Sequence, residues 1–174
     1  MGFALYAAAV SAARDPFLYV GLGVPDTLDG RFDLVGLFVV LLIERLRRAP
    51  LPGSDLAQAV FDAMFNDMDM TLREMGVGDL SVGKKVKVMW EALHGRAAAY
   101  AAAIDREDDP ALAAALERNV WRGVTPPAGS AAALARLVFA ERAYLADQSL
   151  EALAAGQAHF RSVTSATGGA GATR

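Results

Sequence analysis

The stretch GDLSVGKK, residues 78–85, has the residue types and the spacing of a phosphate-binding loop. In the pattern G-x-x-x-x-G-K-[ST], the glycines bring backbone N–H groups close to phosphate, the lysine reaches the terminal phosphates, and the hydroxyl group binds Mg²⁺. The stretch matches every position except the last, where Lys85 replaces the hydroxyl residue. A nucleotide- or phosphate-binding enzyme is therefore one hypothesis for this chain.

The surroundings of this stretch favour a connection between two helices instead. A phosphate-binding loop follows a β-strand, whereas the residues before Gly78 continue a helical pattern of apolar side chains. Gly76 is placed to end one helix, and Asp79 or Ser81 can cap the next one. We predict a helix hairpin here and keep the nucleotide site as the alternative.

Other residues that could bind a metal or take part in catalysis are few. Asp62, Asn66 and Asp69 share one face of a predicted helix, and their oxygens would suit a hard cation. An ion pair between Asp69 and Arg73 on a solvated face is the interpretation that we favour. His94 has no evident catalytic partner. The chain has no cysteine and two histidines, which excludes thiol nucleophiles, thiolate metal sites and histidine-rich metal sites. We expect no catalytic residue, no cofactor and no metal.

Composition argues for a helical protein that does not bind nucleic acid. The 174 residues carry a formal net charge of −3, so the chain lacks the excess of Lys and Arg that binding to nucleic acid requires. The apolar run LVGLFVVLLI, residues 34–43, is much shorter than the roughly 20 residues that span a bilayer. A buried helix is the favoured interpretation of this run. A peripheral lipid-binding module that uses Arg45, Arg47 and Arg48 is the alternative.

Apolar residues at steps of three and four indicate where the helices lie. The hairpin helices are expected over residues 56–75 and 82–104, and further helices over residues 3–13, 32–48, 109–121 and 130–153. No run alternates apolar and polar residues as a strand would. We predict an all-α fold, a single compact domain of about six helices built round a central antiparallel helix hairpin. The domain is expected to cover residues 1–162, with a disordered tail over residues 163–174.

The hairpin also carries residues that could contact a partner. Lys84 and Lys85 make the start of its second helix basic, which suits either the acidic first helix or an acidic or lipid-adjacent partner. Five methionines, Met64, Met68, Met70, Met75 and Met89, lie around the hairpin. Their spacing predicts that all except Met70 belong to the core. Trp90 would be an interface anchor if it were exposed.

Three blocks of the sequence resemble a known family. They are PFLYVGLGVPDTLDGRFDLVGLF (residues 16–38), MFNDMDMTLREMGVGDLSVGKKVKVM (residues 64–89) and HGRAAAY (residues 94–100). The blocks resemble the ubiquinol–cytochrome c chaperone family, the bacterial relatives of a mitochondrial assembly factor for the cytochrome bc1 complex. The long irregular strings within them make the resemblance specific, and residues after 107 contribute little to it.

The resemblance implies a non-enzymatic assembly chaperone that holds newly made cytochrome b before haem insertion and complex assembly. The partners it implies are cytochrome b in its apo or newly inserted form, a small helical protein and the membrane surface. With no signal peptide evident, we expect a cytoplasmic protein, peripheral on the cytoplasmic face of the inner membrane. The candidate contacts for client or partner are Arg31, Lys84, Lys85, Arg96, Met70 and Trp90.

Overall fold

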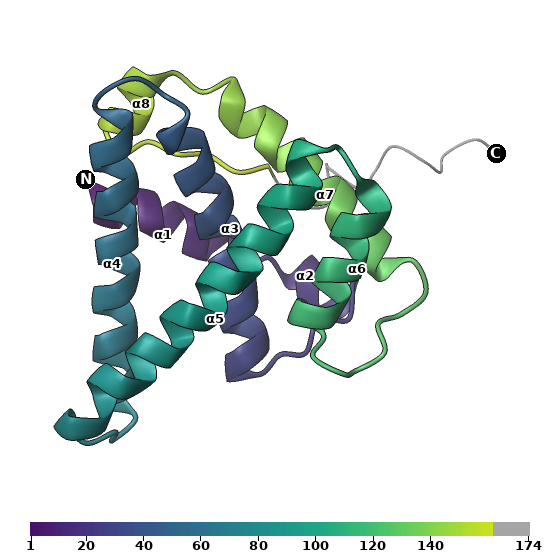
Figure 1. Ribbon diagram of the computed structural model, residues 1–174, viewed down its shortest axis with the longest axis horizontal. Coiled ribbons are helices and arrows are strands. Elements are labelled where there is room, and N and C mark those ends of the chain that lie inside the picture. Colours follow the sequence, from purple (N-terminus) through teal and green to yellow (C-terminus); the bar gives the residue numbers. More distant parts are fainter. Residues whose placement is uncertain (162–174) are drawn as a thin grey trace.

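The computed structural model describes residues 1–161, and these fold into α-helices and the loops between them (Figure 1). Six helices have 12 residues or more: α1 (Gly2–Ala13), α3 (Leu28–Arg47), α4 (Gly53–Glu74), α5 (Asp79–Asp105), α6 (Asp109–Val120) and α7 (Ser130–Ala146). The helices α2 (Pro16–Val20) and α8 (Leu150–Ala154) have 5 residues each. The predicted all-α class is confirmed, and the predicted tail lies outside the described residues.

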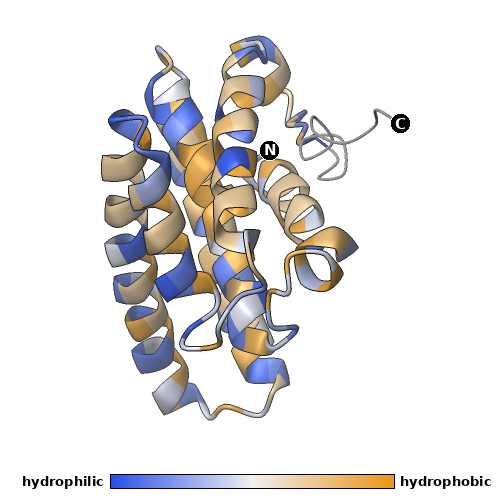
Figure 2. Cartoon of the chain, turned by 90° about the vertical axis from the view of Figure 1, so that its right-hand side faces the viewer, coloured by the Kyte–Doolittle hydropathy of each residue, from blue (hydrophilic) through white to orange (hydrophobic). Residues whose placement is uncertain are grey.

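The helix at the centre of the core is α3, because its sequence is apolar on most of its faces. Its second half is buried from Leu37 to Leu42, and α1, α4, α5, α6 and α7 all contact the helix. Figure 2 shows hydrophobic residues through the middle of the bundle and polar residues along its outer helices. A helix of this kind must be covered on all sides, so the buried-helix interpretation is confirmed. Among residues 1–161, no helix combines the length and the apolarity that crossing a membrane requires.

The predicted hairpin is formed by α4 and α5, which diverge into a V whose point projects from the body (Figure 1). Gly76 ends α4 with a positive φ of 81°, as its placement predicted. The cap of α5 is Gly78, whose extended backbone makes no side-chain cap bond, so the prediction that Asp79 or Ser81 caps this helix is wrong. Asp79 lies in the first turn and pairs instead with Arg73 at the end of α4.

The predicted last helix over residues 130–153 is two helices. The turn between α7 and α8 is stabilised by Arg45 of α3, whose Nε donates to the Leu145 carbonyl at 2.9 Å and whose Nη2 donates to the Gln148 carbonyl at 2.7 Å. Ser149 then caps α8 in an extended conformation. A tertiary contact from a residue 100 positions away therefore ends α7 before the apolar pattern does.

Glu141 of α7 is a buried carboxyl group that fastens the C-terminal segment. Its two carboxylate oxygens accept hydrogen bonds from the Arg161 backbone N–H, both at 3.2 Å. Burial raises the pKa of Glu141 to about 7, against the opposing effect of that hydrogen bond. The stability of the domain should therefore depend on pH near neutrality.

Candidate functional site

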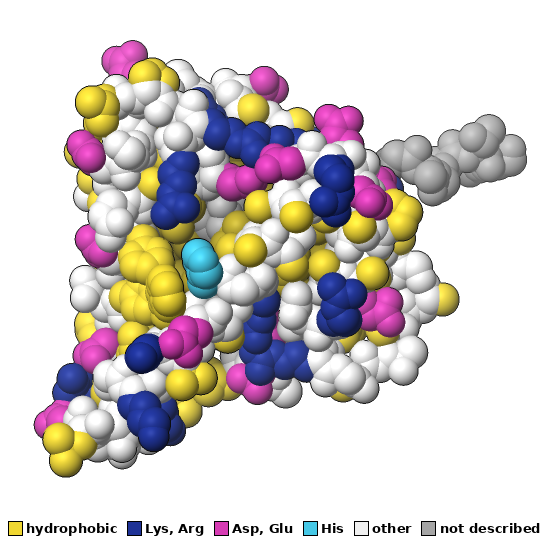
Figure 3. Space-filling view, in the orientation of Figure 1, with side chains coloured by type: hydrophobic (Ala, Val, Ile, Leu, Met, Phe, Trp, Pro, Cys, Tyr) yellow, Lys and Arg dark blue, Asp and Glu magenta, His cyan; other side chains and the backbone are white. Residues whose placement is uncertain are grey.

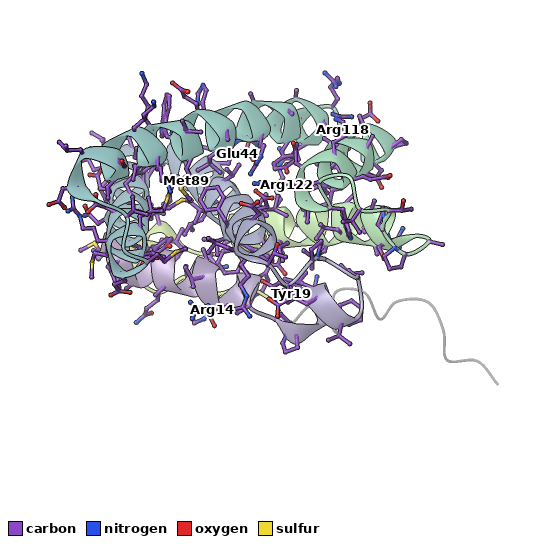
Figure 4. The ribbon with its side chains drawn as sticks, turned by 90° about the horizontal axis from the view of Figure 1, so that it is seen from below. Arg14, Tyr19, Glu44, Met89, Arg118 and Arg122 are labelled. Carbon is purple, nitrogen blue, oxygen red and sulfur yellow. The ribbon has the colours of Figure 1, made fainter. Side chains whose placement is uncertain are left out.

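A groove of about 520 Å³ opens between the hairpin and the N-terminal helices. Its apolar lining comes from α3, α4 and α5 and includes Phe32, Val35, Met64, Met68, Met75 and Met89. We call it the methionine groove. Figure 4 looks into this side of the molecule, with Met89 of α5 on one side and Arg14 and Tyr19 of the N-terminal segment on the other.

The methionines are placed for adaptable contact with an apolar ligand. Met64 and Met68 are buried as predicted, and Met89 is partly buried against the core. Met75 is 57% exposed, so its predicted place in the core is wrong: it is the C-cap residue of α4 and lies beyond the packed turns. Unbranched, polarisable methionine side chains change shape at low cost. The groove can therefore fit apolar side chains of different shapes.

One wall of the methionine groove is held by a buried carboxylate. Asp33 of α3 is buried and accepts hydrogen bonds from Arg122 Nε at 2.6 Å and Arg122 Nη2 at 2.8 Å. Arg96 Nη1 of α5 donates to the same carboxylate. Burial raises the pKa of Asp33 above its usual value, and the two arginines act in the opposite direction. The three residues tie α3, α5 and the end of α6 together beside the groove.

The opposite rim is set by two tyrosines. Tyr6 of α1 donates from its hydroxyl to Asp67 Oδ2 of α4 at 2.7 Å, and burial together with that carboxylate raises the pKa of Tyr6. The Tyr19 hydroxyl donates to the Ala13 carbonyl at 2.8 Å. Arg14 also faces the groove and makes no ion pair within the part of the chain that the structure describes. This rim therefore combines fixed hydroxyl groups with an unpaired cation.

A smaller cavity of about 240 Å³ lies on another side of the hairpin, between α3, α4 and α5. Trp90 stacks on His94 with ring centroids 5.2 Å apart, and Phe61 and Phe65 are paired at 4.5 Å. Figure 3 shows hydrophobic side chains gathered between α4 and α5 on this face. Trp90 is exposed, as an interface anchor needs to be.

The six candidate contacts predicted from the sequence fall in three places. Arg31 and Arg96 line the methionine groove, although Arg31 pairs with Asp26 and Arg96 with Asp33. Trp90 lines the smaller cavity. Lys84, Lys85 and Met70 lie exposed on the hairpin, outside both cavities.

Two residues that line the groove, and the buried carboxylate behind its wall, were missed by the sequence reasoning. Arg14 and Arg122 belong to no motif, apolar stripe or charge cluster that the sequence shows. Arg122 reaches Asp33 across 89 positions of sequence. Asp33 did carry a signal, because it is a lone carboxylate immediately before an apolar run. A buried carboxylate needs hydrogen-bonding or charged partners. The position of Asp33 could therefore have predicted a cationic partner for it.

The chain resembles known proteins over most of its length. A family model described as "Ubiquinol-cytochrome C chaperone" matches residues 21–160. The chain belongs to this family. The crystal structure of the Cbp3 homolog from Brucella abortus is similar, with 37% sequence identity and a TM-score of 0.83 over 93% of this chain and 89% of that one. A comparison with curated proteins gave no match.

Family membership and the structure together decide between the hypotheses for GDLSVGKK. The protein is a non-enzymatic chaperone of the ubiquinol–cytochrome c family. The stretch joins two helices, which is not the strand-to-helix context of a phosphate-binding loop. The acidic face of α4 is likewise engaged, since Asp62 accepts from Gln58 and Asp69 forms the predicted ion pair with Arg73.

Proposed function

We propose that the protein binds newly made cytochrome b and assists assembly of the ubiquinol–cytochrome c reductase complex. The observation that carries this proposal is the methionine groove, in a chain that belongs to a chaperone family named for this respiratory complex. A membrane protein that is not yet assembled exposes apolar helix surface. An adaptable apolar groove can cover such a surface without demanding one fixed shape.

The rim of the groove would position the client. Apolar segments of cytochrome b would lie against Met68, Met75 and Met89, and polar loops would meet Arg14 and the arginines of the opposite wall. Arg31 and Arg96 are the predicted contacts that lie at the right place for this role. Because Arg96 is held by Asp33, it would contribute a guanidinium group in a fixed position whose charge Asp33 partly offsets.

The remaining candidate contacts belong to other surfaces of the same protein. We assign Trp90 and the smaller cavity to a small helical partner protein, because an exposed aromatic beside an apolar cavity is a usual anchor of interfaces. Met70 lies 59% exposed on the outside of α4 and would extend the client contact beyond the groove. The proposed location is the cytoplasmic face of the inner membrane.

The proposal is tested by replacing Met75 with a photo-crosslinking amino acid in the organism that encodes the chain. Met75 is exposed at the mouth of the groove, so the replacement leaves the core intact. We expect cytochrome b to be the main crosslinked product during its synthesis. Leu51, 76% exposed in the turn before α4 and so at the opposite end of that helix from Met75, is the matched control position and should give no such product. Equal crosslinking at both positions would contradict a specific groove.

A second experiment measures the consequence for the complex. Deletion of the gene should lower the b-type haem spectrum of the membranes, and the wild-type gene should restore it. Met75→Glu should restore it poorly, because a charge at the groove mouth opposes apolar binding. Leu51→Glu carries the same change outside the groove and should restore it fully. Normal haem spectra in the deletion strain would refute the proposed function.

A further inference from the structure

The point of the α4–α5 hairpin combines an exposed leucine with unpaired lysines. We call residues 75–87 the hairpin tip; it projects from the body and shows hydrophobic and basic side chains together (Figures 1 and 3). Leu80 has a relative exposure of 101%, the highest of the large apolar side chains in residues 1–161. Within residues 1–161, no packing contact therefore explains a leucine at this position.

The hairpin tip is the positive end of an acidic protein. It contains Lys84, Lys85 and Lys87 against a single acid, Asp79, in a chain with a formal net charge of −3. Asp79 is already paired with Arg73. Within the described residues, Lys84 and Lys85 form no ion pair, and Lys87 lies 3.9 Å from Glu91. The cationic charge of the tip is therefore available to an anionic surface.

Leu80 is presented together with two of the three lysines of the tip. Leu80, Lys84 and Lys87 stand at positions i, i+4 and i+7 of α5, so they share one face of the helix. At the other side of the turn, Met75 is also exposed. Long lysine side chains beside an apolar residue match the boundary between lipid headgroups and acyl chains, where the ammonium groups stay in water.

We propose that the hairpin tip binds the surface of an anionic lipid bilayer, with Leu80 inserted at headgroup depth and Lys84 beside it on the same face of α5. Lys85, further round the helix, would reach the lipid phosphates with its long side chain. A lipid surface fits better than a protein, because the apolar side chains of the tip stand on a narrow point. Added Cβ atoms at Gly76, Gly78 and Gly83 would meet nothing within 4 Å, so the tip is not packed against the rest of the described chain at these positions. A headgroup layer needs charge and a small apolar insertion only.

The other cluster of cations is less available to lipid. At the end of α3, Arg45 donates to two carbonyl oxygens of the turn after α7. Arg48 bridges Glu44 at 3.1 Å and Asp105 at 2.6 Å. Two of the three arginines that suggested a lipid-binding module are thus engaged in the fold. The hairpin tip replaces that cluster as the membrane contact.

Flotation with protein-free vesicles tests this inference without any client, so its outcome is separate from that of the proposed function. The full chain is mixed with vesicles of phosphatidylcholine, with or without 30 mol% phosphatidylglycerol, at low salt and in 0.5 M salt. We expect flotation with the anionic vesicles at low salt only, because the attraction is electrostatic. Absence of flotation with anionic vesicles at low salt would overturn the proposal.

Matched variants locate the contact. Leu80→Ser should lower the partition coefficient about tenfold, since it removes one inserted apolar side chain. The double variant Lys84→Glu, Lys85→Glu should lower it more than a hundredfold, at about fivefold for each unit of charge. Leu51→Ser and the double variant Arg118→Glu, Arg136→Glu make the same changes at exposed positions elsewhere and should float like wild type.

Two results would overturn the assignment even if the wild type floats. One is flotation of the tip variants at the wild-type level, and the other is an equal loss in the control variants. If the tip variants float normally but lose crosslinks to a protein, the tip is a protein contact and the lipid proposal is wrong. Because all the substituted side chains are exposed, thermal unfolding should be unchanged and serves as the folding control.

Discussion

The Asp33 carboxylate should be the residue on which the wall of the methionine groove depends most. Its side chain is fully buried, and it is the partner of Arg96, whose side chain is only 16% exposed. In Asp33→Ala, Arg96 keeps its charge and loses that partner. Breaking a buried pair in this way costs about 3–5 kcal/mol. Arg122 adds less, because it is more exposed and keeps Asp29 at 3.1 Å. We expect a loss of about 3–4 kcal/mol.

Urea denaturation followed by tryptophan fluorescence measures this loss. Trp121 is buried next to Arg122, and its Nε1 donates to the Gly23 carbonyl at 3.1 Å, so its emission reports on the same wall. The control is Asp29→Ala, which removes an exposed partner of Arg122 and should cost less than about 1 kcal/mol. If Asp33→Ala costs no more than Asp29→Ala, the buried network does not hold the wall and the reasoning fails.

Two further predictions concern pH and backbone packing. Because the folded-state pKa of Glu141 is raised to about 7, its contribution to stability is present below the unfolded value and is lost as pH rises through 7. Glu141→Gln should therefore raise the free energy of unfolding at pH 8 by at most about 3 kcal/mol and have little effect at pH 4.5. Equal effects at the two pH values would refute this account of Glu141. Gly30→Ala should cost about 2 kcal/mol or more in urea denaturation, because its Cβ would overlap the Pro25 carbonyl. Gly36→Ala should cost less, since only the movable end of Leu93 lies in its way; equal costs would contradict this account.

The helices were predictable wherever local pattern determines them. The apolar stripe of α4 as far as Leu72, the run in α3 and the glycine turn at Gly76 all depend on neighbouring residues, and the structure confirms each of them. The break between α7 and α8 was missed, because it depends on Arg45, which comes from α3. Local apolar spacing continues through the turn and carries no sign of that contact.

The site could be predicted only in part for the same reason. Helical spacing predicted that Met64, Met68 and Met89 turn toward the core, and all three line the methionine groove, but the groove itself and the place of Arg96 in it were not predicted. Asp33 and Arg122 meet across 89 positions, and Arg122 has a positive φ of 44° that no local motif announced. The polar wall of the groove therefore depends on contacts between residues far apart in the sequence, while its apolar lining follows from the helical spacing of apolar residues.

The stretch GDLSVGKK shows how a motif can be specific without being catalytic. Gly76, just before it, is needed for a left-handed turn, and Val82 within it is buried, so part of this region serves the fold. Leu80, Gly83, Lys84 and Lys85 serve no packing that the described residues show, since they are exposed or face open space. An exposed leucine beside two lysines at a projecting turn is explained best by a binding partner at that turn. The stretch that resembled a nucleotide loop thus becomes the surface where the proposed membrane contact can be tested most directly.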